Sequence, residues 1–193
     1  MCFYIQKMTD ELDEQELAKL CSEGNRLAED ELYTRYAGMV FALCKRYCRN
    51  TEDAKDLMQD AMIRVLDTIS TYRFSGQGSL SGWIRRITIN MALNRIQRRR
   101  LSYISLDNRI QYPLPEPTGQ DVQRIPQDAI LTMISQLPDA RRAVFNLYCI
   151  DGYSHKEIGE KLGISEKGSA GILSKAKKQL QKMIIDYLNK TEV

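Results

Sequence analysis

The sequence predicts an all-α protein with two helical domains joined by a flexible linker, the C-terminal one containing a helix-turn-helix. Three observations support this fold class. Apolar residues recur at helical spacing over residues 51–71 and again over 79–100. A stretch with alternating prolines and no periodicity follows, and residues 153–178 then predict two short helices joined by a tight turn. The expected parts are a first domain at 9–100, a linker at 101–125 and a second domain at 126–190.

Composition places the chain among ordinary globular proteins. Its 193 residues carry 28 Lys and Arg against 25 Asp and Glu, and 43% of them are hydrophobic, which argues against disorder. The distribution of charge is more informative than the net charge of +3. Acids dominate from Asp10 to Glu31, whereas Arg85 to Arg100 contains six Arg and no acid. This asymmetry indicates one surface for phosphate and another for a basic protein partner.

Neither the cysteines nor the N-terminus indicates a metal, a cofactor or a membrane anchor. The five Cys are irregularly spaced, and Cys44 and Cys48 have no nearby His or third Cys to complete a zinc site. We therefore expect reduced thiols in a cytoplasmic protein. The longest apolar run, Met39 to Cys44, is too short to span a bilayer, so we expect no direct membrane insertion. Residues 1–7 match nothing that follows, and Met8 is an alternative translation start.

The helix predicted over Thr51 to Thr71 has two unlike faces. Its apolar stripe comprises Leu57, Met58, Ala61, Met62, Val65, Leu66 and Ile69. The opposite side carries Glu52, Asp53, Asp56, Gln59, Asp60 and Asp67. Acids in the first turn suit the helix dipole, so a solvated face explains them. A surface that docks against a basic protein groove explains them equally well, and spacing alone leaves both interpretations open.

A breaker-rich loop, Tyr72 to Ser81, leads into the next helix, Ser79 to Arg100. Its predicted inward residues are Leu80, Trp83, Ile84, Ile87, Met91 and Ile96, and its polar side presents Arg85, Arg86, Asn90, Asn94, Arg95 and Arg98. Aromatic rings and Arg planes stack on unpaired bases, and Arg neutralises phosphate, so this segment suits DNA whose strands are parting. Trp83 lies on the apolar face, which favours a core residue over a base wedge.

The second half of the chain predicts a capped helix-turn-helix. Ser154 is a good N-cap, and Glu157 three residues later is its capping-box partner. Gly163 follows the first helix where a left-handed residue would end it, and Ser165 caps the second helix. That second helix has the apolar residues Leu173, Ala176 and Leu180 and the cations Lys175, Lys177, Lys178 and Lys182. This arrangement projects a cationic helix that fits a DNA major groove.

The linker predicted over residues 101–125 is long enough to hold both domains on one stretch of duplex. In partly extended form its 25 residues reach on the order of 50–75 Å at ~3.1 Å per residue. One to two turns of duplex occupy roughly 35–70 Å. Two DNA-reading domains would therefore fit on one promoter-sized segment.

These residues together resemble the extracytoplasmic-function class of bacterial sigma factors. The first half carries EDAKDLMQDAMIRV at 52–65 and GSLSGWIRRITINMALNRIQRRR at 78–100, which look like the core-binding and promoter-melting segments of sigma domain 2. The second half carries LPDARRAVFNLYCIDGYSHKEIGEKLGIS at 137–165, which looks like sigma domain 4. Two independent sets of motifs in the right order, with a linker between them, cover about four-fifths of the chain, which is stronger evidence than a lone helix-turn-helix.

The resemblance implies a transcription initiation factor that binds core RNA polymerase, at its largest-subunit clamp and its flap, and promoter DNA. It also implies an anti-sigma factor as a partner, and no enzymatic chemistry, since the polymerase does the catalysis. The implied polymerase-binding residues are Asp53, Asp56, Leu57, Gln59, Asp60 and Ile63. The residues implied at the −10 element are Tyr72, Phe74, Ser79, Arg85, Arg86, Asn90, Asn94 and Arg98. Those implied at the −35 element are Ser154, His155, Lys156, Ser165, Glu166, Lys167, Ala170, Gly171, Ser174, Lys175 and Lys178.

The recognition helix departs from the pattern of the family. Base-contact positions hold Ala170 and Gly171, which offer no long polar arm, and Gly168 with Gly171 costs about 2 kcal/mol of helix propensity relative to Ala. We therefore expect weak or shape-dependent −35 reading, with phosphate contacts from Lys175 and Lys178 supplying much of the affinity.

Two other functions remain open from the sequence. A stand-alone DNA-binding regulator would use the same helix-turn-helix but leaves the acidic surface of residues 56–60 unexplained. A sigma-like antagonist would occupy polymerase without reading promoters, which the glycine-bearing recognition helix permits. The sequence offers little support for an enzymatic function. The single His, His155, lies in the helix-turn-helix, where a hydrogen bond to phosphate is favoured over proton transfer in catalysis.

Overall fold

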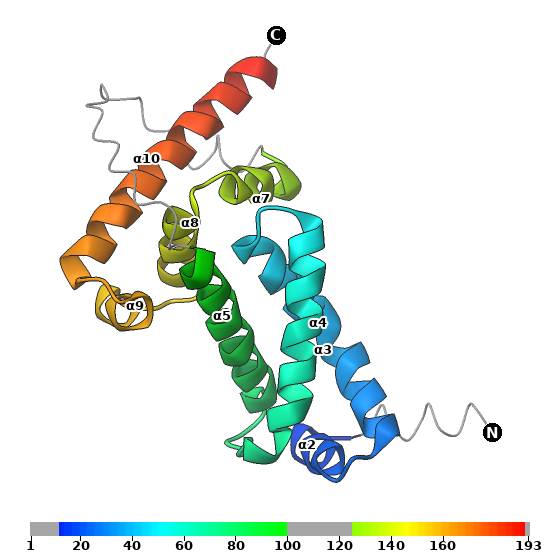
Figure 1. Ribbon diagram of the computed structural model, residues 1–193. Helices are drawn as coiled ribbons and strands as arrows, with labels where there is room; N and C mark the ends of the chain where they lie inside the picture. Colours follow the sequence, from blue (N-terminus) through cyan, green and yellow to red (C-terminus); the bar gives the residue numbers. More distant parts are fainter. Residues whose placement is uncertain (1–11, 100–124, 192–193) are drawn as a thin grey trace. The chain divides into compact units, whose positions relative to one another are not determined.

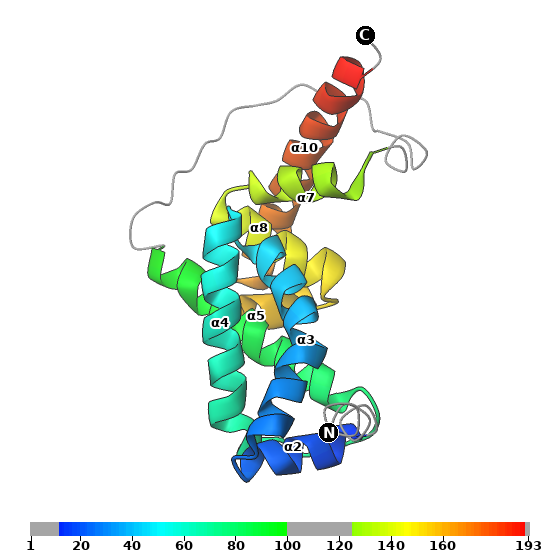
Figure 2. The same ribbon diagram turned by 90° about the vertical axis from the view of Figure 1, so that its right-hand side faces the viewer.

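The protein is described here from a computed structural model that covers residues 12–99 and 125–191, and every regular element in these ranges is a helix (Figures 1 and 2). The chain is all-α with two helical domains, as the sequence predicts. Of the predicted linker, only Ile125 lies among the described residues. It is 5% exposed and packs against residues of α7 and α10.

Packing divides the chain into two compact units. The first lies within Met1–Cys44 and Asn50–Ala92, and the second within Lys45–Arg49 and Leu93–Val193. The helices of the first unit are α2 (Glu14–Ser22), α3 (Arg26–Tyr47), α4 (Thr51–Thr68), the short 3-10 helix η1 (Ile69–Thr71) and α5 (Ser79–Arg99), whose last turns belong to the second unit. Those of the second unit are α7 (Gln127–Ser135), α8 (Asp139–Phe145), the π-helical turn η3 (Asn146–Ile150), α9 (His155–Leu162) and α10 (Glu166–Thr191).

Short polar side chains start the helices of the first unit. Asp13 accepts from the Glu16 amide at 2.8 Å and so begins α2. The sequence predicts this helix over residues 9–20; the cap shows why it begins at Glu14, and residues 9–11 lie outside the described ranges. Asn25 and Asn50 do the same for α3 and α4. Each cap pairs one backbone N–H that the helix itself leaves without a partner.

The core of the first unit forms between α2, α3, α4 and α5. Its fully buried side chains include Leu17, Leu32, Val40, Ala61, Val65, Leu80 and Ile84. Both views show α3 and α4 running alongside one another and α2 lying across the end of α4 where η1 begins (Figures 1 and 2). The end of the unit at α2 and η1 therefore brings the acidic N-terminal helix next to the loop that leads into α5.

The core of the second unit forms along α10, which packs against α7, α8 and α9 (Figure 1). One cluster contains Ile125, Met133, Ile134, Leu137, Ala176 and Leu180. Arg142 of α8 is 1% exposed, and its guanidinium donates to the backbone oxygens of Ser135 and Leu137 and to the carboxylate of Asp139. These bonds compensate for burying the cation and fix the α7–α8 corner. Burial lowers the pKa of Arg142, and the charge of Asp139 opposes that shift.

Candidate functional site

The exposed side of α4 combines carboxylates, an amide and one large apolar side chain. The exposed members of the predicted set are Asp56, Gln59, Asp60 and Ile63. They share one face because they are spaced three, four and seven residues apart. Ile63 is 59% exposed, more than any other large hydrophobic side chain in the described residues. Asp53 is half-buried, and Leu57 is 2% exposed and belongs to the core beneath this face.

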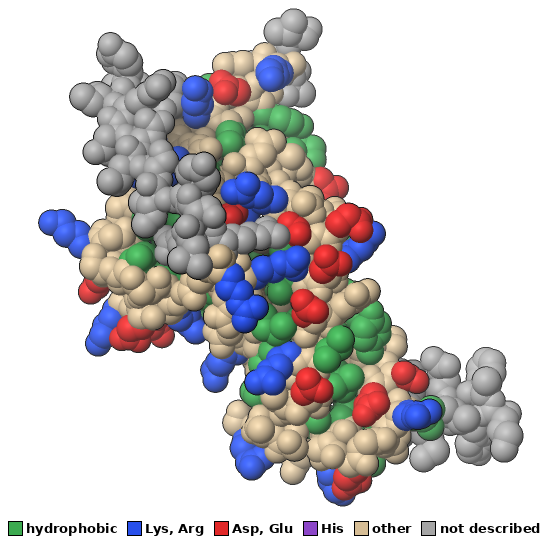
Figure 3. All heavy atoms as spheres, in the orientation of Figure 1, with side chains coloured by type: hydrophobic (Ala, Val, Ile, Leu, Met, Phe, Trp, Pro, Cys, Tyr) green, Lys and Arg blue, Asp and Glu red, His purple; other side chains and the backbone are tan. Residues whose placement is uncertain are grey.

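Helix α5 carries the opposite charge. Residues 79–99 contain five Arg and no acid, whereas α4 contains five acids against two cations. Figure 3 shows Lys and Arg side chains mainly over α5, beside the Asp and Glu side chains over α4. The exposed members of the predicted −10 set on α5 are Arg86, Asn90, Asn94 and Arg98, and Arg85 is half-buried. Helices α4 and α5 are thus neighbours of opposite charge, with Arg85, Arg86 and Asn90 of α5 in the first unit and its last turns in the second.

The loop between η1 and α5 is fixed at its entry by Tyr72. The Tyr72 ring is 8% exposed, and its centroid lies 5.6 Å from that of Trp83. Its hydroxyl lies 2.5 Å from the Ser79 hydroxyl, and the amide of Ser75 donates to the same Ser79 oxygen at 3.3 Å. These contacts make Tyr72 and Ser79 supports of the loop. Phe74, in contrast, is 45% exposed and is the aromatic side chain that the loop presents.

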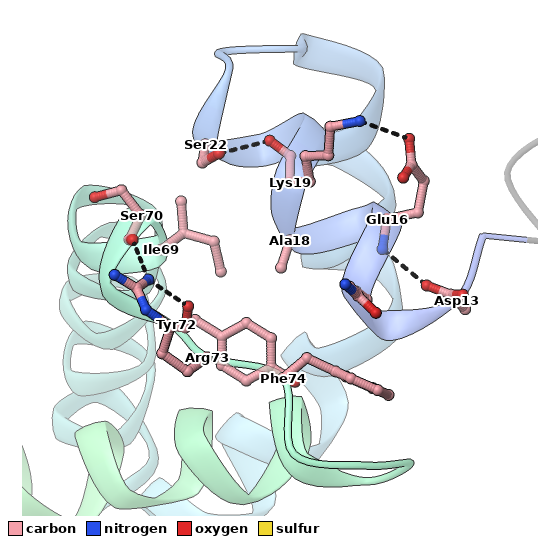
Figure 4. Close-up of a pocket in the computed structure, with 11 residues that line it drawn as sticks. Asp13, Glu16, Ala18, Lys19, Ser22, Ile69, Ser70, Tyr72, Arg73 and Phe74 are labelled. Carbon is pink, nitrogen blue, oxygen red and sulfur yellow. Dashed lines mark hydrogen bonds and ion pairs between the residues drawn. The ribbon is translucent and has the colours of Figure 1, made fainter.

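A cleft of about 650 Å³ lies between α2 and the chain from Ile69 to Phe74 (Figure 4). Its α2 wall is polar and includes Asp13, Glu16 and Lys19, and the facing wall includes the Phe74 ring. The Arg73 guanidinium donates to the backbone oxygens of Ser70 and Tyr72, at 3.0 and 2.9 Å, which stiffens that wall. The volume falls within the ~300–1,000 Å³ typical of pockets for small organic groups.

Glu14 of α2 joins this end of the unit to α5, and sequence reasoning missed it. Its carboxylate accepts from the Leu80 amide at 3.0 Å and from the Tyr36 hydroxyl at 3.3 Å. The first bond caps α5 from a residue 66 positions away, which no local sequence signal reveals. Burial, and then the charge and hydrogen bond of Glu14, raise the pKa of Tyr36 to about 12.

The helix-turn-helix forms as its sequence predicts. Ser154 and Glu157 make both bonds of the capping box at the start of α9. Gly163 ends α9 in the left-handed region, with φ 66° and ψ 39°, and the Ser165 hydroxyl accepts from the Gly168 amide at the start of α10. The Ile164 amide donates to the Gly159 oxygen at 3.0 Å, which closes the turn. Ile158, Leu162 and Leu173 are buried between the two helices.

Most of the side chains predicted at the −35 element lie on the surface of this motif. The exposed ones are Ser154, Lys156, Ser165, Glu166, Lys167, Ala170, Gly171, Ser174, Lys175 and Lys178. The exceptional member is His155, which is half-buried and makes internal contacts. Its ring stacks on Tyr148 with centroids 4.4 Å apart, and its Nδ1 lies 2.9 Å from the hydroxyl of Ser169. Ser169 is fully buried, and no local sequence signal singles it out.

The cysteines are mostly internal. Cys21, Cys44 and Cys48 are buried, and Cys149 is exposed. Burial, and then the charge of Glu29, raise the pKa of the Cys21 thiol to about 11, so this thiol is protonated at neutral pH. Within residues 12–99 and 125–191 no three His, Cys, Asp or Glu side chains gather as metal ligands would. In the same ranges no helix combines the length and the apolar character needed to cross a bilayer.

Two models of one protein family match the two halves of the chain. The model for sigma-70 region 2 matches residues 32–101, and the model for sigma-70 region 4 matches residues 127–180. The first match contains the acidic face of α4 and the cationic face of α5. The second contains the whole of α9 and most of α10.

Curated relatives carry the same assignment over most of the chain. The ECF RNA polymerase sigma factor SigE of Mycolicibacterium smegmatis is 31% identical over 83% of this chain and 62% of its own length, so the match leaves over a third of that relative uncovered. The ECF RNA polymerase sigma factor SigM of Mycobacterium tuberculosis is 27% identical over 93% of this chain and 88% of its own length. In fold, the chain is similar to the sigma factor RpoE of Bartonella quintana, solved with the anti-sigma factor NepR. That match has a TM-score of 0.50 and 16% identity and covers 80% of this chain and 95% of that one.

Proposed function

Because the chain belongs to the extracytoplasmic-function class of the sigma-70 family of RNA polymerase sigma factors, we propose that it directs core RNA polymerase to a specific set of promoters and starts transcription there. The observation that carries the proposal is the pair of neighbouring helices with opposite charge, α4 and α5. An acidic face suits a basic protein partner, and a cationic face suits DNA. The second unit adds a capped helix-turn-helix for a second DNA element.

The exposed face of α4 would bind the clamp of the largest polymerase subunit. Asp56 and Asp60 supply charge that steers a basic partner, and Ile63 supplies an apolar anchor that is exposed in the free protein. Leu57 and Asp53 contribute less direct contact in this proposal, since the first is in the core and the second is half-buried. Leu57 instead holds the face in place from beneath.

The exposed face of α5 would lie along the −10 element. Arg86 and Arg98 neutralise phosphate, while Asn90 and Asn94 offer amides to base edges. The cleft beside Phe74 would accept a base that leaves the stack as the strands part (Figure 4). Stacking of one base on an aromatic ring is worth about 1–3 kcal/mol, which offsets much of the cost of unstacking it. The acids of α2 on the far wall repel phosphate and so favour entry by the base.

The exposed side of α10 would read or follow the −35 element, and α9 would contact the backbone beside it. The surface around Ala170 and Gly171 has no long polar arm, so we propose that phosphate contacts from Lys175 and Lys178 dominate. The same small side chains favour one second candidate, an antagonist that binds polymerase but reads no promoter. The second unit would also dock on the polymerase flap. An anti-sigma factor would bind the protein and hold it inactive; RpoE is solved in complex with the anti-sigma factor NepR.

Charge reversal on α4 tests the polymerase-binding part of the proposal. We expect Asp60→Lys to weaken binding of the full chain to core polymerase from the same host at least tenfold, because it places a cation against a basic groove. The matched control is Asp30→Lys, which makes the same change at an exposed position of α3 and should bind like the wild type. Equal binding by Asp60→Lys and the wild type would contradict the proposed surface.

A further inference from the structure

The single histidine of the chain is held in one orientation by two other elements of the second unit. His155 occupies the first position of α9, directly after the N-cap Ser154. The Tyr148 ring of η3 stacks on the imidazole with an interplanar angle of 18° and centroids 4.4 Å apart. The Ser169 hydroxyl of α10 lies 2.9 Å from Nδ1. Stacking fixes the plane of the ring, and the hydrogen bond fixes its rotation within that plane.

Ser169 is the unusual member of this group. Its relative exposure is 0%, at a position of α10 that faces the buried side of the helix-turn-helix. A buried hydroxyl costs free energy unless it has a hydrogen-bond partner, and the imidazole 14 residues earlier provides one. The bond therefore links the first turn of α9 to the start of α10, the two parts of the motif that approach DNA.

We propose that Ser169 is a positioning residue for promoter contact, which it serves by holding His155 in one tautomer. Its hydroxyl donates to Nδ1, so the neutral imidazole carries its proton on Nε2. Within residues 12–99 and 125–191 no residue forms a hydrogen bond with Nε2, and the His155 side chain is partly exposed. The Nε2–H group then donates to a phosphate oxygen of the DNA backbone beside α9. This role rests on the proposed function, because it needs the helix-turn-helix to engage promoter DNA.

The bond partner on one ring nitrogen sets the chemistry of the other. Without the hydroxyl, the neutral ring keeps only the modest preference for the proton on Nε2 that a free imidazole has, and part of the population would turn an acceptor toward phosphate. A purely packing role for residue 169 makes a different prediction, because any side chain of similar volume would then serve. Threonine and valine separate the two roles, since they share one shape and differ in the hydroxyl.

The first test reads the tautomer directly in the full chain. With one His in the sequence, a spectrum that correlates the imidazole nitrogens with the ring protons contains a single pattern. The spectrum is recorded at pH 8. We expect Nε2–H in the wild type and in Ser169→Thr, and a mixture of tautomers in Ser169→Val. An Nδ1–H wild type, or identical Thr and Val spectra, would overturn the proposal.

The second test measures promoter binding by the complete holoenzyme, on a fragment from a start site that this holoenzyme uses. We expect Ser169→Val to bind about fivefold more weakly than Ser169→Thr, the size of one lost hydrogen bond. Adding Ser169→Val to His155→Ala should cause no further loss, because Ser169 acts through that ring. Additive losses would overturn the positioning role.

The two proposals fail in different ways. A wild-type holoenzyme that yields no start sites would overturn the proposed function, and with it the promoter contact inferred for His155. A wild-type holoenzyme that binds tightly, together with Thr and Val variants that bind equally well, would overturn the role of Ser169 alone.

Discussion

Two glycine-to-alanine substitutions in the helix-turn-helix should change stability in opposite directions. A Cβ built on Gly159 of α9 lies 2.7 Å from the backbone oxygen of Ile164, closer than real Cβ contacts come. That oxygen belongs to the turn that the Ile164 amide closes by donating to Gly159. No flexible side chain can move aside, so the turn between α9 and α10 must open. At Gly171, in contrast, an added Cβ would have no heavy atom of a neighbouring group within 4 Å.

The magnitude follows from two opposing terms. Alanine gains about 0.5–1 kcal/mol over glycine inside a helix. Overpacking costs typically about 1–3 kcal/mol. Gly159→Ala should therefore destabilise the second unit by about 1–2 kcal/mol. Gly171→Ala has the gain in helix propensity without the overpacking, so it should stabilise this unit by up to about 1 kcal/mol.

Urea unfolding of the full chain, followed by far-ultraviolet circular dichroism, measures both variants. For a slope of ~2 kcal/mol/M, a loss of 1.5 kcal/mol lowers the midpoint by about 0.7 M. The Trp83 fluorescence of the first unit serves as the reference transition, because neither substitution touches that unit. Stabilisation of equal size by both substitutions would refute the reasoning, since it would mean that the turn yields without cost.

Three further predictions concern single groups. The pKa of Glu157 is lowered chiefly by its hydrogen bonds to Ser154, so its contribution to stability is present above about pH 4.5 and is lost as the pH falls through its folded-state pKa. In thermal unfolding, the Tm of the wild type should exceed that of Glu157→Gln at pH 7, and the two Tm values should converge near pH 3. A difference in Tm that stays constant with pH would contradict this prediction. Glu14→Ala should destabilise the first unit by about 1–2 kcal/mol because it removes the cap of α5, and Glu14→Gln, which keeps an acceptor, should destabilise it by less. Unfolding monitored by Trp83 fluorescence measures both variants, and an equal loss of stability in the two would contradict the role of Glu14 as a cap. Ala170→Arg should tighten holoenzyme binding to a −35 duplex several-fold by adding a polar arm at an exposed position, and unchanged affinity would contradict the surface assigned to α10.

Local signals in the sequence predict the elements of this protein well. The capping box at Ser154 and Glu157, the left-handed Gly163 and the stripe of α4 depend on neighbours within four residues, and each forms as expected. The stripe of α5 is less well predicted. Thr88 and Ile89 are buried while Ile87 is half-buried, because a helix with this many apolar residues offers more than one face to a core.

Contacts between distant parts of the chain could not be predicted from the sequence. Tyr72 is an aromatic residue in a loop without periodicity, and only its partners Trp83 and Ser79 decide that its ring is buried. Glu14 looks like one acid of an acidic helix until the fold brings it to α5. Ser169 looks like a polar residue near the start of the second helix of the motif, although it is buried against His155.

Promoter direction by this chain is best tested by transcription in vitro. Core polymerase from the same host is reconstituted with the full chain, transcribes sheared genomic DNA, and the RNA 5′ ends are mapped. If the chain directs polymerase to promoters, new start sites that share a two-part upstream element will appear. A chain that binds the polymerase without producing new starts would contradict promoter direction and leave the antagonist as the function. A chain that does not bind the polymerase at all would contradict the α4 surface on which the account rests.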